Sequence, residues 1–279
     1  MLKKSNIAAA ILLSGVLAGV VALDISHFAH AEAATPASPF TPAQEARIGK
    51  VAADYLIAHP EVLVKVSEAL QARQQAAMMK AMTDGALALQ SELLHDPHAP
   101  SYGPAEAKVV VTLFFDYQCV YCSQLAPVLT KVMKANPQVR FVFREWPIFG
   151  DRWPASRLAA ETGLKVWQQK GAEAYLAYHN GVYATGHNEG ALTENDIRTA
   201  AKAVKVDSAK AESQDVQAEL TLTGQLARNI GLTGTPGLVV MPATGATAET
   251  VTVIPGMTDR AVLQMAINTA AGLTNPAKP

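Results

Sequence analysis

The sequence predicts an α/β fold that carries an all-helical insertion and follows an N-terminal helical arm. Residues 108–143 show a strand, a helix and a second strand in succession. Residues 155–230 are rich in alanine and favour helices, whereas residues 238–271 predict a β-hairpin and a final helix. Strands separated by a helical block indicate one sheet covered by helices, with the block inserted between its strands.

The strands of the α/β part are marked by runs of valine and aromatic residues. The run from Lys108 to Phe115 is apolar almost throughout, which is typical of a strand buried on both faces. In the helix that follows, Pro127 can introduce a bend. The expected elements are strands at 108–115, 139–143, 238–241 and 250–254, and helices at about 119–135 and 259–271.

Residues 40–96 form the predicted arm. Thr41 is expected to cap a helix with Pro42 at its first position, and apolar residues from Ile48 to Leu56 recur on one face of it. His59-Pro60 interrupts this helix; a second helix follows, and then a third helical run over roughly residues 71–94. Because short amphipathic helices cannot bury their apolar faces alone, we expect the arm to fold back on the main domain or, preferably, to pair with the arm of another copy.

The N-terminus has the pattern of a secretory signal peptide. Lys3 and Lys4 precede an almost continuously apolar run, Ile7 to Leu23, and small residues follow at Ala29-His30-Ala31. This pattern predicts a cleavable signal over residues 1–31 and export to an oxidising compartment. The alternative is an uncleaved membrane anchor, although the apolar run is short for a span of about 20 residues.

Composition limits the remaining classes. Roughly 250 residues follow the signal, enough for one sizeable domain with an appendage. Hydrophobic residues make up 49% of the chain and charged residues 17%, which is typical of a folded globular protein. The net charge is −1, so nothing indicates binding to nucleic acid.

The segment Cys119-Val120-Tyr121-Cys122 contains both cysteines of the chain. It lies between a predicted strand and a predicted helix, so Cys119 is expected at a helix N-terminus. There the unpaired N–H groups and the helix dipole favour a thiolate, the species that attacks disulfides. The second thiol can then release a mixed disulfide formed by the first. The pattern therefore indicates redox exchange.

Two other uses of the cysteine pair are weaker alternatives. A structural zinc site normally has four ligands, and no pair of histidines downstream of Cys122 has the spacing of a zinc finger. A purely structural disulfide would close a very small loop, which constrains the unfolded chain little. No metal and no organic cofactor is needed for thiol exchange.

Four segments resemble the DsbA-like branch of the thioredoxin superfamily. Phe114–Cys122 (F-F-D-Y-Q-C-V-Y-C) is similar to the active-site segment of that family, and Gly234–Gly237 to its threonine–cis-proline loop. Glu145–Gly150 resembles the segment after the second strand, and Ile254–Gly256 the end of the last hairpin strand. These segments occur in the family's order, over roughly residues 107–272.

The resemblance implies both the fold and a role for the arm. A thioredoxin fold is implied at residues 105–272, with the all-helical insertion at about 155–230. Tyr55–Leu63 resembles the N-terminal helical region of ScsC-like members, some of which oligomerise through it and act as isomerases. A homo-oligomer formed through residues 40–96 is therefore expected.

The resemblance also assigns roles to individual residues. Cys119 is the attacking thiolate and Cys122 resolves the mixed disulfide, so a redox-active disulfide takes the place of a cofactor. Pro236, expected in the cis form, shapes the loop beside the sulfurs, and the Thr235 backbone pairs with an extended substrate segment. Glu145 is expected to be a buried acid near Cys122 that accepts a proton, or else to form a surface salt bridge.

The dipeptide between the cysteines departs from the strongly oxidising members of the family. Val120-Tyr121 stands where those enzymes have Pro-His, so no histidine is available there to stabilise the Cys119 thiolate. A less extreme pKa and a less oxidising pair are expected. Tyr121 is expected to be a partly exposed contact that tunes Cys119. A tyrosine before the second cysteine is similar to the dimeric periplasmic isomerases and favours disulfide shuffling.

The sequence as a whole predicts an exported, periplasmic thiol-disulfide oxidoreductase that forms or isomerises disulfides in secreted proteins. Its expected partners are unfolded or misoxidised secreted proteins and a membrane redox partner of the DsbB or DsbD type. Oxidase, isomerase and bifunctional enzyme all remain open. The alternative is an exported metal-handling or surface binding protein that uses the fold as a scaffold, against which the intact cysteine pair argues.

Overall fold

The computed structural model describes residues 39–207 and 214–273. The predicted signal peptide, residues 1–31, lies outside the described residues. The chain divides into two compact units, one ending at Val64 and one beginning at Lys65. Within the described ranges, no helix combines the length and the apolar character needed to cross a membrane.

Helix α1 (Pro42–Ala58) has the predicted cap at its N-terminus. The Thr41 side chain accepts a hydrogen bond from the Gln44 backbone N–H, and the Gln44 side chain accepts one from the Thr41 N–H. The helix ends at His59, as predicted, where the backbone N–H donates to the Tyr55 carbonyl. None of the residues of α1 is buried, and Ile48 is half-exposed. The apolar face predicted from the sequence is therefore uncovered within this unit.

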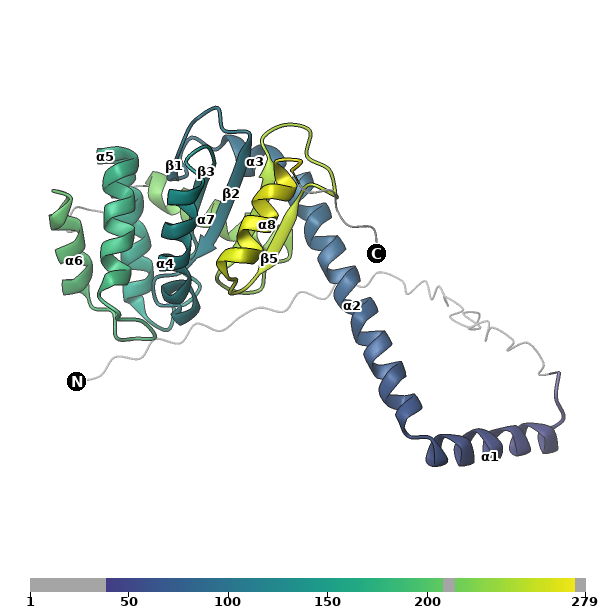
Figure 1. The fold of residues 1–279 in the computed structure, drawn as a ribbon. Coiled ribbons are helices and arrows are strands. Elements are labelled where there is room, and N and C mark those ends of the chain that lie inside the picture. Colours follow the sequence, from purple (N-terminus) through teal and green to yellow (C-terminus); the bar gives the residue numbers. More distant parts are fainter. Residues whose placement is uncertain (1–38, 208–213, 274–279) are drawn as a thin grey trace, which may run out of the picture. The chain divides into compact units, whose positions relative to one another are not determined.

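A five-stranded sheet organises the second unit (Figure 1). Strands β2 and β3 are parallel, and the other neighbouring strands are antiparallel. The four predicted strands are confirmed, and a short edge strand that the sequence does not predict, β1, pairs with β3. β1 has only two residues and so carries no detectable periodicity. The order across the sheet is β1 (Ser101–Tyr102), β3 (Arg140–Glu145), β2 (Val109–Phe115), β4 (Gly237–Pro242) and β5 (Thr252–Pro255).

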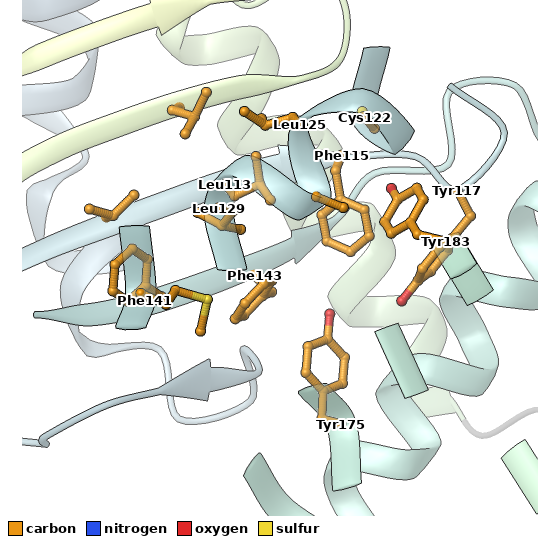
Figure 2. Packing of buried hydrophobic residues seen from close by; sticks show 14 of the residues in the cluster. Leu113, Phe115, Tyr117, Cys122, Leu125, Leu129, Phe141, Phe143, Tyr175 and Tyr183 are labelled. Carbon is orange, nitrogen blue, oxygen red and sulfur yellow. The ribbon is translucent and has the colours of Figure 1, made fainter. Parts of the chain in front are cut away.

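Alternate side chains of β2 enter two separate hydrophobic cores. Leu113 and Phe115 point into a first core, which α4 (Val120–Ala135) and α8 (Arg260–Ala270) also line (Figure 2). Phe114 points to the opposite face of the sheet and packs in a second core. Every residue of β2 is buried, which explains why the strand is apolar without alternation.

Three helices form the insertion between β3 and β4. They are α5 (Pro154–Ala184), α6 (Glu194–Ala203) and α7 (Gln214–Ile230). The backbone of α5 is broken at Gly171, where a φ of 73° suits glycine. Helix α6 packs on α5, and α7 packs on α5 and on β3. The predicted α/β architecture with an all-helical insertion is therefore confirmed.

The arm differs from the prediction beyond His59. Helix α2 (Glu61–Ala88) is one continuous helix, so a separate helix beginning near residue 71 is wrong. The stretch contains alanine, glutamine and methionine, which are good helix formers, and nothing in it ends a helix. A Cβ at Gly85 would lie 2.9 Å from the Asn229 carbonyl oxygen, so glycine permits close approach of α2 to the end of α7. Met82 and Ala86 enter the second core there, and α3 (Gln90–His95) follows.

A buried arginine joins the segment around α3 to the sheet and to α7. Arg144 of β3 is fully buried, and its guanidinium donates to the carboxylates of Asp96 and Glu219 and to the Glu92 carbonyl. Burial raises the pKa of Glu219, against the opposing effect of Arg144. The charge of Arg144 is therefore neutralised inside the protein by groups from two other segments.

Replacing Arg144 by methionine is expected to lower the free energy of unfolding by about 3–5 kcal/mol, because Asp96 and Glu219 then stay buried without their partner. Urea unfolding of the full-length chain measures the change. Arg198→Met is the matched control, since the Arg198–Glu194 pair lies on the exposed surface of α6 and its loss should cost far less. Equal losses in the two variants would contradict this account of the buried network.

Candidate active site

The cysteine pair lies where β2 ends and α4 begins. Cys119 is the N-cap residue of α4, with extended backbone angles, and Cys122 is the third residue of the helix. The Cys119 backbone N–H donates to the Asp116 carbonyl, which closes the turn between strand and helix. Cys119 and Cys122 are only 4% and 3% exposed, and both are unpaired thiols. The sequence placed Cys119 at this helix end, and the structure confirms that position.

The surroundings of Cys119 favour its thiolate. A hydrogen bond from the Cys122 thiol has the largest effect and lowers the pKa of Cys119 to about 6, although burial acts in the opposite direction. The backbone N–H groups of Tyr121 and Cys122 contribute further, as expected at a helix N-terminus. Cys119 is therefore largely ionised at neutral pH.

The same site has the opposite effect on Cys122. Burial raises the pKa of the Cys122 thiol well above its usual value, and the neighbouring Cys119 raises it further. Cys122 thus stays protonated and can donate to Cys119. The two thiols therefore differ strongly in acidity, with Cys119 the more acidic.

The loop that precedes β4 closes over the cysteine pair. The Thr235–Pro236 peptide bond is cis, as predicted. The Cys119 thiol donates to the Thr235 carbonyl across a distance of 3.2 Å. The Thr235 hydroxyl is buried and has no hydrogen-bond partner among the residues that the structure describes, yet it lies near enough to both sulfurs to favour a thiolate. Pairing of Gly237 with Phe114 in the sheet brings this loop beside the end of β2.

The two residues between the cysteines lie at the surface of the site. The side chain of Tyr121 is 56% exposed, and Val120 is partly buried. The contribution of Tyr121 to the Cys119 pKa comes through its backbone N–H. The exposed ring is therefore available to other molecules.

Glu145 lies at the end of β3, inside the first core. Its Oε1 accepts hydrogen bonds from the hydroxyls of Tyr117 (3.1 Å) and Tyr175 (2.8 Å), and burial raises its pKa well above the usual value. A Cβ at Gly163 would lie 2.5 Å from this oxygen, so glycine makes room for the carboxyl group. Within the described residues Glu145 forms no salt bridge, and no direct contact joins it to Cys122.

Two residues of the site were missed by sequence reasoning. The Asp116 carboxyl accepts hydrogen bonds from the backbone N–H groups of Gln118 and Phe149 and from the Ser156 hydroxyl, and burial raises its pKa. Gln118 contacts the loop before α6. An aspartate that bonds its own backbone two residues on is a recognisable turn signal, and it could have revealed Asp116.

The described residues contain no group of three or more histidine, cysteine, aspartate or glutamate side chains able to hold a metal ion. The site brings together two thiols of very different acidity, a buried carboxyl group and the Thr235 carbonyl beside the Cys119 sulfur.

Alkylation of Cys119 in the reduced protein is expected to follow a titration with its midpoint near pH 6. Rates with iodoacetamide across a pH series, with the modified residue located by mass spectrometry, measure it. Cys122→Ala and Thr235→Val should each move the midpoint upward, because each removes a group that favours the thiolate. Thr130→Val, which removes a hydroxyl bonded within α4, should not.

A midpoint near the ordinary cysteine value in the unmodified protein would contradict this electrostatic account.

The lowered pKa of Cys119 also makes the free energy of unfolding of the reduced protein depend on pH. Folding favours the Cys119 thiolate, so its contribution to the stability of the reduced protein is complete above the unfolded thiol's pKa of about 8.5. That contribution is lost as the pH falls through about 6.

The chain is similar to several solved structures. BcfH of Salmonella enterica Typhimurium shares 45% sequence identity with it at a TM-score of 0.70, over 82% of this chain and 96% of that one. ScsC of Proteus mirabilis in a transitional conformation shares 26% identity at a TM-score of 0.56, over 84% of this chain and 98% of that one.

A curated relative, the Na(+)/H(+) antiporter NhaA 3 of Salinispora tropica, is 34% identical over 67 residues, or 24% of this chain. This chain spans about a tenth of the length of the curated relatives it matches.

Two family models match separate parts of the chain. The model of the copper resistance protein ScsC N-terminal domain matches residues 44–77. The model of the DSBA-like thioredoxin domain matches residues 110–268, more than half of the chain, and covers β2 from Val110 onward, β3, β4, β5, the insertion and the cysteine pair. The chain therefore belongs to the DSBA-like thioredoxin family of thiol-disulfide oxidoreductases.

Proposed function

We propose that this protein is an exported, periplasmic thiol-disulfide oxidoreductase that acts on secreted proteins through Cys119 and Cys122, with isomerisation as its main activity. The observation that carries the proposal is the opposite shift of the two thiol pKa values. A lone acidic cysteine would form mixed disulfides and remain trapped. A second, protonated thiol within hydrogen-bonding reach supplies the means of release.

In the reduced enzyme, the Cys119 thiolate attacks one sulfur of a substrate disulfide. A new S–S bond joins Cys119 to the substrate, and the other substrate sulfur leaves as a thiolate that takes a proton from solvent. In isomerisation a different thiol of the substrate, as its thiolate, attacks the substrate sulfur of the mixed disulfide; a new substrate disulfide forms and the Cys119 thiolate leaves, so no net electrons are transferred. In reduction, Cys122 loses its proton and attacks the Cys119 sulfur; the enzyme pair is oxidised and the substrate disulfide reduced.

Oxidation of a substrate uses the same steps in reverse. A substrate thiolate attacks the Cys119–Cys122 disulfide, and the second substrate thiol then displaces Cys119. The enzyme must then be reoxidised for oxidase work or kept reduced for isomerase work. A membrane redox partner of the DsbB type would serve the first purpose and one of the DsbD type the second.

The substrate is proposed to be an unfolded or misoxidised polypeptide. The Thr235 carbonyl lies beside the reactive sulfur, where an extended segment could accept or donate backbone hydrogen bonds as an added strand. The exposed ring of Tyr121 offers an apolar contact next to the same sulfur. Both features suit a loose polypeptide chain of variable sequence.

Glu145 is proposed to assist the proton transfer of Cys122 through other groups. The Tyr117 hydroxyl donates to Glu145, and Tyr183, which donates to the Asp116 carbonyl, is influenced by both Cys122 and Glu145. Because burial raises the pKa of the Glu145 carboxyl well above its usual value, we propose that this carboxyl exchanges a proton with the cluster.

Helix α1 is proposed to join copies of the chain. Its apolar side chains Ile48, Val51 and Tyr55 are each more than half exposed and line one face together with Phe40. Exposed apolar faces of this kind mark interaction sites. An assembly would present several cysteine pairs to one misfolded substrate, which favours isomerisation over single-site oxidation.

The mature protein is expected to reactivate an enzyme substrate whose disulfides have been scrambled, and Cys119→Ala should abolish the activity because the attacking sulfur is gone. Cys122→Ala should instead accumulate mixed disulfides with the substrate, visible on non-reducing gels, because release by the second thiol is lost. Full activity of the Cys119→Ala variant would sink the proposal in favour of an exported binding protein.

Val51→Glu and Tyr55→Glu are expected to lower the molecular mass measured by light scattering and to reduce isomerase activity together, because a charge on the apolar face of α1 opposes its burial between copies. Oxidation of a reduced peptide should persist. Ala53→Glu is the matched control, since it places the same charge on α1 outside that face. An unchanged mass in all three variants would show that α1 does not join copies.

A further inference from the structure

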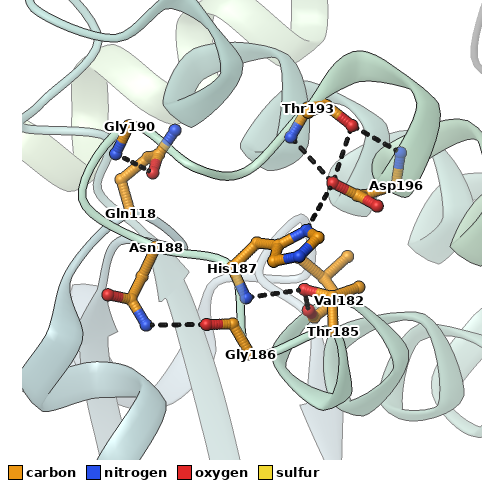
Figure 3. A network of polar contacts seen from close by, with 9 residues as sticks. All are labelled: Gln118, Val182, Thr185, Gly186, His187, Asn188, Gly190, Thr193 and Asp196. Carbon is orange, nitrogen blue, oxygen red and sulfur yellow. Dashed lines mark hydrogen bonds and ion pairs between the residues drawn. The ribbon is translucent and has the colours of Figure 1, made fainter.

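The loop between α5 and α6, residues 185–193, is hydrogen-bonded to Gln118, the residue that precedes Cys119. The Gly190 backbone N–H donates to the Gln118 side-chain oxygen at 2.8 Å (Figure 3). The Glu189 N–H donates to the Gln118 carbonyl at 2.9 Å. The carbon of that carbonyl is bonded to the Cys119 nitrogen. The Glu189 N–H therefore contacts the peptide group that joins Gln118 to Cys119, although Glu189 and Cys119 are 70 positions apart in the sequence.

This α5–α6 loop has a defined shape. Gly186, Glu189 and Gly190 all have positive φ angles, and 49° is an uncommon value for a residue such as Glu189. A Cβ at Gly190 would lie 2.8 Å from the Trp153 indole nitrogen, so the ring fixes the loop from the side of α5. At the other end His187 pairs with Asp196 of α6 at 2.9 Å (Figure 3).

A packing role alone does not explain a glutamine at position 118. It is 1% exposed, and its side-chain nitrogen is buried without a hydrogen-bond partner within the described parts of the chain. An unpaired buried donor of this kind destabilises the folded protein. An apolar side chain of similar size would fill the same space without that cost. What the amide gains is the bond to Gly190, which holds the α5–α6 loop against the start of the active-site turn.

We propose that Gln118 is a positioning residue that fixes the α5–α6 loop as a second wall of the substrate site, in addition to the Thr235–Pro236 loop. This inference rests on the proposed function. A polypeptide in extended form advances about 3.3 Å per residue, so the residues next to a cysteine bound to Cys119 come within reach of the backbone at Glu189. The surface from Gly186 to Gly190, where every residue except Asn188 is exposed, would contact those residues of the substrate, whereas a small disulfide has no peptide to make this contact.

Gln118→Met in the full-length reduced protein tests the proposal. The two probes are dithiobis(nitrobenzoic acid) and a peptide whose cysteine carries the same thionitrobenzoate group, so the leaving group is identical. In both reactions the Cys119 thiolate forms a disulfide and thionitrobenzoate is released, and its absorbance gives the rate. The ratio of the peptide rate constant to the small-disulfide rate constant is expected to fall about fivefold, through a higher half-saturating peptide concentration, with the limiting single-turnover rate constant changed less than twofold.

The matched control is Gln217→Met. It removes a side-chain hydrogen bond from Gln217 of α7 to Glu161 of α5 and should leave the ratio unchanged. Gly190→Ala is the second variant, should Gln118→Met fail to fold. Its new Cβ meets Trp153, so the loop is displaced while Gln118 stays, and the same fall in the ratio is expected.

An unchanged ratio in a folded variant would overturn the inference, and so would an equal fall with both probes or an upward shift of the Cys119 titration midpoint. Those results would mean that Gln118 acts on the thiolate or only on stability. If the unmodified protein releases thionitrobenzoate from neither probe, the proposed function itself fails. The two failures are therefore distinguishable.

Discussion

The hydrogen bonds of the Asp116 carboxyl hold together the turn on which the cysteine pair stands. One oxygen accepts from the Gln118 N–H, and the other accepts from the Phe149 N–H and the Ser156 hydroxyl. These bonds join the end of β2, the segment after β3 and the first turn of α5 at one point. The site is thus built where sheet and insertion meet, and the placement of both thiols depends on that junction.

The chemistry of the pair arises from burial acting on two unequal groups. Burial alone would keep both thiols protonated. The pKa of Cys119 is lowered nevertheless, because the Cys122 thiol, the Thr235 hydroxyl and the N–H groups of the helix N-terminus all favour its thiolate. Cys122, one turn further into the first core, has less such support and gains the negative charge of its neighbour. Placing one cysteine at the helix cap and the other inside the helix therefore gives the two thiols opposite pKa shifts, and the proposed division into attacking and releasing thiol rests on this difference.

The parts of the fold with strong periodicity could be predicted from the sequence, as could the residues that carry the family's motifs. The strands at 109–115 and 140–145 and the cap at Thr41 are examples. The sequence could not decide whether Glu145 lies in the core or at the surface, because a single carboxylate shows no periodicity from which its burial could be predicted. The contacts of Gln118 were invisible for a different reason: they join residues some 70 positions apart and depend on three left-handed backbone angles.

The second core draws part of its material from residues that precede the sheet. Met82, Ala86, Leu93 and Leu94 pack there with Phe114 and Trp146, and Asp96 neutralises Arg144 from the same segment. The segment that looks like the end of an appendage is therefore an integral part of the catalytic fold. In any recombination between relatives, an arm exchanged by cutting at the loop near residue 105 would leave an open hydrophobic face and would remove Asp96 and the Glu92 carbonyl from Arg144, which would keep only Glu219 as its ion-pair partner. The boundary between the two compact units lies earlier, between Val64 and Lys65 inside α2. Because α2 is one continuous helix, no loop marks that boundary.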